Sequence, residues 1–224
     1  VPEEFPDGMF MSADKPSRSL RHVHTADGKR LGLFGGENHL SGHQTDTKAN
    51  YQALAHFAES EFDVAQINQF WSAQDLVSLD KVPYIGQMTS DDPNILVATG
   101  FAKWGMTNGI AAGLLLSDLL TGTPNRFRGL FDPNRSKLHK QDAKQFAKNN
   151  ADVAIELLKG KVSRASQSAD DLGIDEGGLI RHSGKTVGGY RDSAGELHLV
   201  KTTCTHMGCD VKWNNGERSW DCPC

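Results

Sequence analysis

All four cysteines of this 224-residue chain lie within its last 21 positions, together with one histidine. Cys204, His206 and Cys209 form a Cys-x-His-x-x-Cys run, and Cys222 and Cys224 form a Cys-x-Cys pair. A cysteine and a histidine one residue apart can converge on one side of a loop, and a second loop must bring the other pair. Because thiolates and imidazoles bind both zinc and iron–sulfur clusters, the pattern predicts a metal site. A disulfide-rich secreted scaffold would carry more cysteines for its length.

The two cysteine loops come at the end of a stretch of short strands and tight turns. The strand candidates are residues 177–182, 186–191, 196–202, 211–213 and 219–221. Asn214-Asn215-Gly216, between the last two, is a hairpin signal. The pattern predicts a small all-β domain that carries the cysteines. A helical stretch over residues 134–159 and a polar, Ser-rich linker over 160–170 precede it.

The first part of the chain has a mixed pattern of strands and helix. Two strand-like runs, residues 20–25 and 30–35, flank an Asp27-Gly28 turn, and a helix starting after residues 45–47 continues to about Phe62. His22 and His24 share one face of the first strand, and we interpret them as polar surface residues rather than metal ligands. Gly42 argues against a helix that would align His39 with His43, so we do not interpret this pair as metal ligands either.

The middle of the chain predicts a strand, a glycine loop and a helix in succession. Residues 95–99 are continuously apolar, as in a buried strand, and 100–106 form a glycine-bounded loop. Thr107 or Asn108 can cap a helix over 109–120, which is apolar on nearly every side and is therefore predicted to be buried. Helix amides and the helix dipole at such a loop favour an electron-rich ligand. An ordinary βα turn of an α/β core gives the same pattern.

Composition and charge limit the classes of partner. Hydrophobic residues make up 38% of the chain, enough for a real core in one large or two modest domains. The formal net charge is −4, without the basic bias that would favour nucleic acid. No run of about 18 apolar residues is present, so no membrane span is predicted. The first residues do not resemble a signal peptide, and we expect a cytoplasmic location.

The cysteine motif resembles the Rieske [2Fe–2S] pattern, through residues 203–209 together with 220–224. The resemblance implies that Cys204 and Cys222 are thiolate ligands and that His206 is an imidazole ligand. It also implies a disulfide between Cys209 and Cys224, as in the cytochrome-complex type of Rieske protein. The second imidazole would belong to the residue after Cys224, so we expect the present residues alone not to hold a cluster stably.

A second resemblance covers roughly residues 5–135. Asp80-x-x-Pro83-x-Ile85-Gly86, residues 98–101 and 104–109, and Leu119-Leu120-x-Gly122 resemble the C-terminal half of FAD-dependent oxidoreductases of the D-amino-acid oxidase and glycine oxidase type, and residues 35–37 fit the same family. In these enzymes the flavin removes a hydride from a carbon that bears an amine. The resemblance implies that the following residues contact the flavin: Gly100, Phe101, Trp104, Gly105, Met106 and Thr107. The family's Gly-x-Gly-x-x-Gly fingerprint does not occur here, so we expect an internal piece of a longer protein, inactive by itself.

Together these patterns predict an α+β chain. Residues 1–135 would be the C-terminal part of a flavin oxidoreductase, with a mixed sheet and a βα flavin unit. Residues 136–172 would be a helix and linker, and 173–224 a truncated all-β Rieske domain. The expected cofactors are FAD and a [2Fe–2S] cluster, and the expected partners are a small-molecule amine and an electron acceptor of unknown identity.

Two other functions stay open at this point. One is an electron carrier or redox sensor that uses Cys209 and Cys224 and has a decayed flavin site. The other is a zinc-stabilised interaction module, although zinc ribbons usually have Cys-x-x-Cys knuckles.

Overall fold

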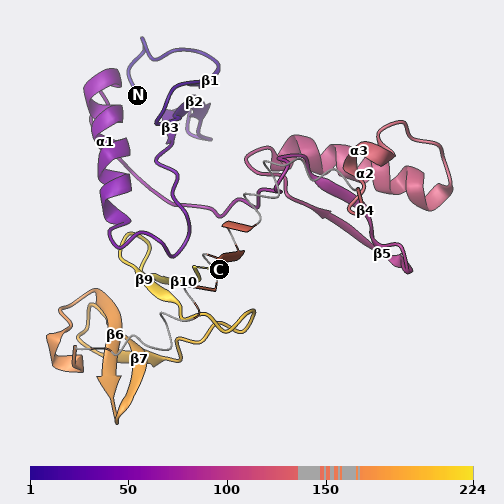
Figure 1. Ribbon diagram of the computed structural model, residues 1–224. Helices are drawn as coiled ribbons and strands as arrows, with labels where there is room; N and C mark the ends of the chain where they lie inside the picture. Colours follow the sequence, from indigo (N-terminus) through magenta and orange to yellow (C-terminus); the bar gives the residue numbers. More distant parts are fainter. Residues whose placement is uncertain are drawn as a thin grey trace. The chain divides into compact units, whose positions relative to one another are not determined.

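The computed structural model describes residues 1–135 and 167–223, with positions 147, 148, 150, 151, 154, 155, 157 and 165 between them. The chain forms two compact units (Figure 1). We call them the terminal unit, Val1–Ser72 with Val153–Cys224, and the central unit, Ala73–Asp152. The terminal unit therefore combines the first part of the chain with the cysteine-rich segment. The predicted domain limits at residues 135 and 172 stay predictions, and the stretch just after residue 135 is incompletely described.

The first part of the terminal unit is a small sheet with one helix. Strands β1 (Met9–Met11), β2 (Ser19–His24) and β3 (Arg30–Gly35) pair antiparallel in that order. The predicted turn connects β2 to β3, and α1 (Lys48–Phe62) follows as expected. An aromatic cluster holds the helix near the sheet, with ring centroids 5.5–6.3 Å apart. Its members are Phe5, Phe34, Phe57 and Phe62, and Phe5 is only 3% exposed.

The second part of the terminal unit is all-β, as predicted. A short 3-10 helix, η1 (Ala169–Asp171), precedes an antiparallel sheet of β6 (Glu176–His182), β7 (Lys185–Arg191) and β8 (Leu197–Val200). A separate hairpin of β9 (Lys212–Asn214) and β10 (Ser219–Asp221) follows.

Two glycines let this hairpin pack closely on the sheet. A Cβ at Gly177 would lie 2.5 Å from the ring of Trp213, and a Cβ at Gly188 would lie 2.7 Å from that of Trp220. The two indoles also contact each other, with centroids 5.2 Å apart. The absence of side chains at these glycines therefore makes room for the aromatic core of the domain.

The central unit is a hairpin covered by helices. Strands β4 (Tyr84–Thr89) and β5 (Asp92–Thr99) pair antiparallel, and α2 (Gly105–Thr121) and α3 (Arg128–Phe131) follow. Its core contains Ile85, Ala112 and Leu115, with Phe101, Leu116 and Phe131 packed against them. Strand β4 was not predicted, because Pro83 directly before it and Gly86 within it favour a turn.

Three predictions about the central unit were wrong. Helix α2 is not buried all round, since Ile110 is 69% and Leu114 is 65% exposed, and Ile95 of the expected buried strand is 47% exposed. Apolar composition indicates that a face favours burial but does not identify the segment that covers it, and within the described residues of this unit a two-stranded sheet covers one face of α2. The helix also begins earlier than predicted, at Gly105, with Trp104 as its N-cap instead of Thr107 or Asn108.

The predicted mixed sheet is likewise not found in the described part of the chain. All strand pairs in the named sheets are antiparallel, and the parallel pairing that occurs is an isolated bridge between Gln167 and Ile180. Most of the helix predicted over 134–159 and of the linker over 160–170 lies outside the described residues. Among the helices that are described, none has the length and hydropathy needed to cross a membrane.

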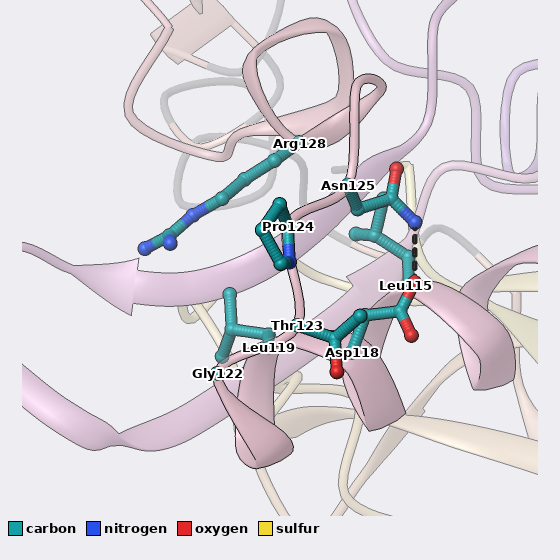
Figure 2. Close-up of a pocket in the computed structure, with 8 residues that line it drawn as sticks. All are labelled: Leu115, Asp118, Leu119, Gly122, Thr123, Pro124, Asn125 and Arg128. Carbon is teal, nitrogen blue, oxygen red and sulfur yellow. Dashed lines mark hydrogen bonds between the residues drawn. The ribbon is translucent and has the colours of Figure 1, made fainter.

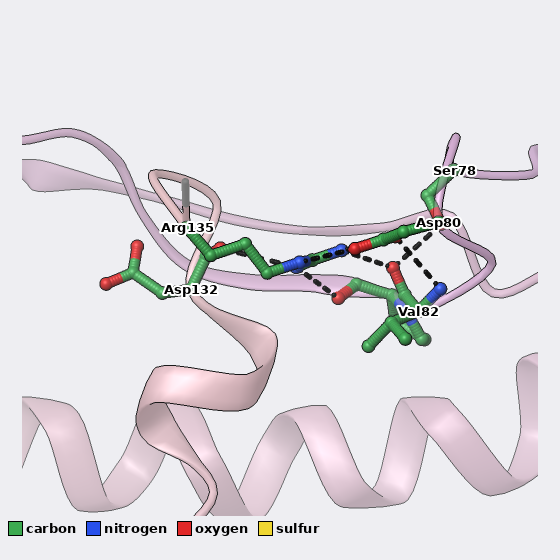
Figure 3. A network of polar contacts seen from close by, with 6 residues as sticks. Ser78, Asp80, Val82, Asp132 and Arg135 are labelled. Atoms are coloured by element: carbon green, nitrogen blue, oxygen red, sulfur yellow. Dashed lines mark hydrogen bonds and ion pairs between the residues drawn. The ribbon is translucent and has the colours of Figure 1, made fainter. Parts of the chain in front are cut away.

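A bidentate ion pair joins Arg135, which follows α3, to Asp80 near the beginning of the central unit (Figure 3). Arg135 donates from Nε and Nη2 to the two carboxylate oxygens of Asp80, each at 2.8 Å. The same guanidinium donates to the backbone carbonyls of Val82, Pro83 and Asp132, and it lies 4.0 Å above the ring of Tyr84. The Arg135 side chain is 8% exposed. Its hydrogen bonds lower the pKa of Asp80 from 3.8 to about 2.

We expect Asp80→Asn to destabilise the central unit by about 2 kcal/mol at pH 7, because it removes an interaction that favours the charged carboxylate. The folded-state pKa is depressed, so the stabilisation is full above the ordinary pKa of 3.8 and is lost as the pH falls toward 2. Native-state hydrogen exchange of the β4 and β5 amides between pH 7 and pH 3 measures it. Asp75→Asn, which removes an exposed pair with Lys103, is the matched control and should change little. Equal stabilities of the Asp80→Asn variant and the wild type at pH 7 would contradict the assignment.

Candidate functional site

The first cysteine loop connects β8 to β9 and is closed by its own backbone. The Cys204 amide donates to the Cys209 carbonyl at 2.7 Å, and the Gly208 amide donates to the Cys204 carbonyl at 3.0 Å. Gly208 has a φ of 76°, which few other residues adopt without strain. An isolated antiparallel bridge between Thr203 and Asp210 closes the base of the loop. This geometry leaves Cys204 half-buried and His206 exposed at the tip.

The second cysteine loop follows β10 and brings Cys222 to Cys204. The backbone amide of His206, and after it the thiol of Cys222, lower the pKa of Cys204. Neither Cys204 nor Cys222 is in a disulfide. A lowered pKa favours the thiolate, which is the form that binds metal. The structure thus brings together the two sulfurs that were predicted to be ligands.

The imidazole of His206 does not lie close enough to these two sulfurs to bind the same metal ion with them. Among the described residues, a group of three possible ligands with their ligand atoms within 4.8 Å of one another occurs elsewhere, at Asp192, Glu196 and His198. A single zinc ion needs all its ligands around one centre. In a Rieske centre, by contrast, thiolates bind one iron and imidazoles bind the other. Two converging sulfurs with a separate imidazole therefore fit a two-iron cluster better than zinc.

Cys209 is completely buried and is disulfide-bonded. Its predicted partner, Cys224, lies outside the described residues, so the pairing itself stays a prediction. A covalent link at Cys209 restrains the base of the first loop, directly below the segment that presents Cys204 and His206.

The sequence did not indicate the group formed by Asp192, Glu196 and His198. Its hydrogen bonds show that these residues stabilise the turn between β7 and β8. Asp192 accepts hydrogen bonds from the amides of Ala194 and Glu196, at 3.0 and 2.8 Å, and from His198 at 2.8 Å. Its hydrogen bond to His198 lowers the pKa of Asp192 and raises that of His198. The carboxylate is thus already used to close the connection between β7 and β8.

The predicted flavin loop leads from β5 into the first turn of α2. Gly100 has a φ of 75°, and the Phe101 side chain packs against the core of the unit. Trp104 and Met106 are 58% and 86% exposed. The N-terminus of α2 has no side-chain cap, and a Cβ placed on Gly105 would meet nothing within 4 Å. The residues present fit a flat, electron-rich group bound against uncapped amides, although their contact with a flavin stays a prediction.

A cavity of about 380 Å³ lies at the other end of α2 (Figure 2). Figure 2 shows that the last turns of the helix, the turn that follows and Arg128 line it, and that Asn125 donates to Asp118 at 2.7 Å. None of the six predicted flavin residues lines this cavity, so it does not extend the candidate flavin site.

The sequence interpretation of His43 was incomplete. It was taken for an ordinary polar residue, but its Nε2 lies 3.1 Å from the carbonyl oxygen of Pro223 in the second cysteine loop. His39, in contrast, contacts Asn50 near the start of α1. His43 and Pro223 are 180 residues apart in the sequence, so no local pattern could have indicated this contact.

Comparison with known proteins gives two matches. Residues 3–119, just over half of the chain, match the family described as FAD dependent oxidoreductase, and this range includes the predicted flavin loop. A relative from Bacillus subtilis (strain 168), named as a Rieske 2Fe-2S iron–sulfur protein, is 44% identical over 221 residues. The alignment covers 99% of this chain but 43% of the relative, so the chain spans less than half of that protein's length. No solved structure gives a significant match.

The family match covers the β1–β3 sheet, α1, the β4–β5 hairpin and nearly all of α2. The predicted resemblance over residues 5–135 overlaps nearly all of this match and continues 16 residues beyond its end at residue 119. This chain therefore belongs to the FAD dependent oxidoreductase family.

Proposed function

We propose that the chain is a portion of a flavin-dependent oxidoreductase that oxidises a C–N bond of an amine or amino acid and carries a Rieske [2Fe–2S] cluster for electron transfer. The observation that carries this proposal is the convergence of Cys204 and Cys222 in a chain whose first half matches the flavin family. The name of the Bacillus subtilis relative gives independent support for the cluster.

The residues have separate tasks in this proposal. Cys204 and Cys222 would bind one iron, and His206 would bind the other together with an imidazole from outside the present residues. The lowered pKa of Cys204 prepares one of these ligands for binding. The buried disulfide at Cys209 holds the first loop while the ligands at its tip stay accessible.

The first turn of α2 would act on the flavin by electrostatics. When bound, FAD supplies hydride acceptance from the amine-bearing carbon, and the cluster supplies one-electron transfer to an external acceptor. Uncapped amides at the N-terminus of a helix stabilise negative charge, which accumulates on a reduced flavin. Gly105 keeps the approach to these amides open.

The structure gives less support to the two other functions. A zinc module would bring His206 into one tight group with the sulfurs, and no such group occurs among the described residues. A thiol redox sensor requires an accessible disulfide, whereas Cys209 is 0% exposed.

We predict that the full-length protein contains bound flavin together with two irons per chain. It should show flavin absorbance and, after reduction, the EPR signal of a Rieske cluster. Anaerobic addition of an amine or amino acid substrate should bleach the flavin absorbance. Zinc in place of iron, or protein free of both iron and flavin, would contradict the proposal.

A substitution pair in the first cysteine loop tests the ligand assignment. We expect Cys204→Ser in the full-length protein to abolish the Rieske EPR signal, because the alcohol does not replace the thiolate bound to iron. Met207→Ser is the matched control, since Met207 is 50% exposed in the same loop and has no predicted role as a ligand. Iron content and EPR intensity measure the outcome. Normal iron content and an unchanged signal in Cys204→Ser would refute the assignment.

A further inference from the structure

The first turn of α1 is capped by a residue from the β9–β10 hairpin. The N-cap residue Thr47 makes no side-chain capping bond of its own. Instead, Oδ1 of Asn215 accepts hydrogen bonds from the backbone amides of Thr47 and Lys48, at 2.9 and 3.1 Å. Amides at the start of a helix need such acceptors, and a side-chain cap contributes about 1 kcal/mol. The hairpin of the cysteine-rich domain thus completes a helix that belongs to the flavin-family segment.

A buried pair of polar side chains reinforces this contact. Thr47 is 4% and Asn214 is 3% exposed, and the Thr47 hydroxyl donates to Oδ1 of Asn214. The Gly216 amide donates to the same hydroxyl at 2.9 Å. A Cβ on Gly216 would lie 2.9 Å from that oxygen and 3.0 Å from the ring of Tyr51. Glycine at this position therefore permits the close approach.

The loop before α1 also contacts the second cysteine loop. Gly42 has a φ of 67°, and a Cβ there would lie 2.6 Å from the nitrogen of Pro223 and 2.9 Å from the carbonyl carbon of Cys222. Next to it, Nε2 of His43 lies 3.1 Å from the Pro223 carbonyl oxygen. A carbonyl oxygen only accepts hydrogen bonds, so Nε2 of His43 carries the proton in this contact.

We propose that residues 42–51 are the docking surface for the cysteine-rich domain and that His43 is a positioning residue for its cluster. The Pro223 carbonyl belongs to the residue that follows the predicted ligand Cys222. A donor from the flavin-family segment therefore fixes the loop that presents this sulfur. The inference about the cluster rests on the proposed function, whereas the docking contact rests on the hydrogen bonds and glycine contacts alone.

The hydrogen bond from His43 to the Pro223 carbonyl should shift the midpoint potential of the cluster in one direction. Groups around metal ligands orient those ligands and tune the metal, and hydrogen bonds near an iron–sulfur cluster help to set its potential. A donor on the carbonyl withdraws negative charge from the ligand loop and so favours the reduced, more negative cluster. Loss of the donor should therefore lower the midpoint potential of the cluster.

The first experiment measures the midpoint potential in the full-length protein by EPR-monitored redox titration. At the wild-type midpoint, we expect His43→Phe to lower the ratio of reduced to oxidised cluster about threefold, as for the loss of one hydrogen bond. His43→Gln, which retains an N–H donor, should restore the wild-type potential. His39→Phe is the matched control and should leave the potential unchanged, because His39 contacts Asn50 instead of the cluster loop.

An unchanged potential in His43→Phe with full cluster content would overturn the positioning role. If the His43→Phe variant loses its cluster, the His43→Gln variant tests whether a hydrogen-bond donor at this position sets the potential. A wild-type potential in the glutamine variant supports the donor role, and loss of its cluster as well rejects that role.

The second experiment needs no cluster. We expect Asn215→Ala to speed hydrogen exchange at the Thr47 and Lys48 amides about tenfold in the metal-free full-length protein, because these amides lose their acceptor. His43→Phe should speed exchange in residues 209–222, and His39→Phe should not. Wild-type exchange rates in both Asn215→Ala and His43→Phe would refute docking. Absence of a Rieske signal from the wild type would refute the proposed function, while the exchange rates would still decide whether the domain docks.

Discussion

Burial of Thr47 and Asn214 is the constraint on which the arrangement of the terminal unit depends. A polar side chain removed from water is costly unless each of its hydrogen-bonding groups has a partner. Each of these residues finds its main partners on the other segment or within its own turn, and Asn214 also donates to Asp221 of β10 at 2.8 Å. The start of α1 and the β9–β10 hairpin therefore satisfy each other's polar groups. Removal of either segment would leave buried polar groups of the other without hydrogen-bond partners.

The central unit depends on a different kind of contact. Its hydrophobic core is small, and the guanidinium of Arg135 supplements it by donating to Asp80 and to the carbonyls of Val82, Pro83 and Asp132. Asp80 of the motif first noted as a family resemblance thus has a structural role, because its carboxylate binds Arg135, whereas the contact at Pro83 uses a backbone carbonyl that any residue would supply. Apolar residues of α2 such as Ile110 and Leu114 stay exposed beside this core.

Local patterns in the sequence predicted most of the local structure. Turn signals such as Asp27-Gly28 and Asn214-Asn215-Gly216 located hairpins correctly, since their preference for tight turns is a property of the residues themselves. The resemblance of the cysteine motif to the Rieske pattern likewise implied that Cys204 and Cys222 converge, and the structure brings these two sulfurs together. The roles of Asn215 and His43 could not be predicted, because their partners are more than 160 residues away. The exposure of α2 was missed for the same reason, as burial depends on distant segments.

The contacts at Gly42 and Gly216 indicate how accurately the two segments must fit. Each glycine places backbone where a side chain would collide with the opposite segment, so a larger residue at either position would push the surfaces apart. The hydrogen bonds across the contact are directional and require aligned donors and acceptors, whereas an apolar contact tolerates sliding. On one side, the second cysteine loop meets Gly42 and His43, and on the other the sulfur of Cys222 faces Cys204. A displacement of Pro223 would therefore be transmitted to Cys222, and the geometry of the metal site follows from the docking of the domain as well as from its own loops.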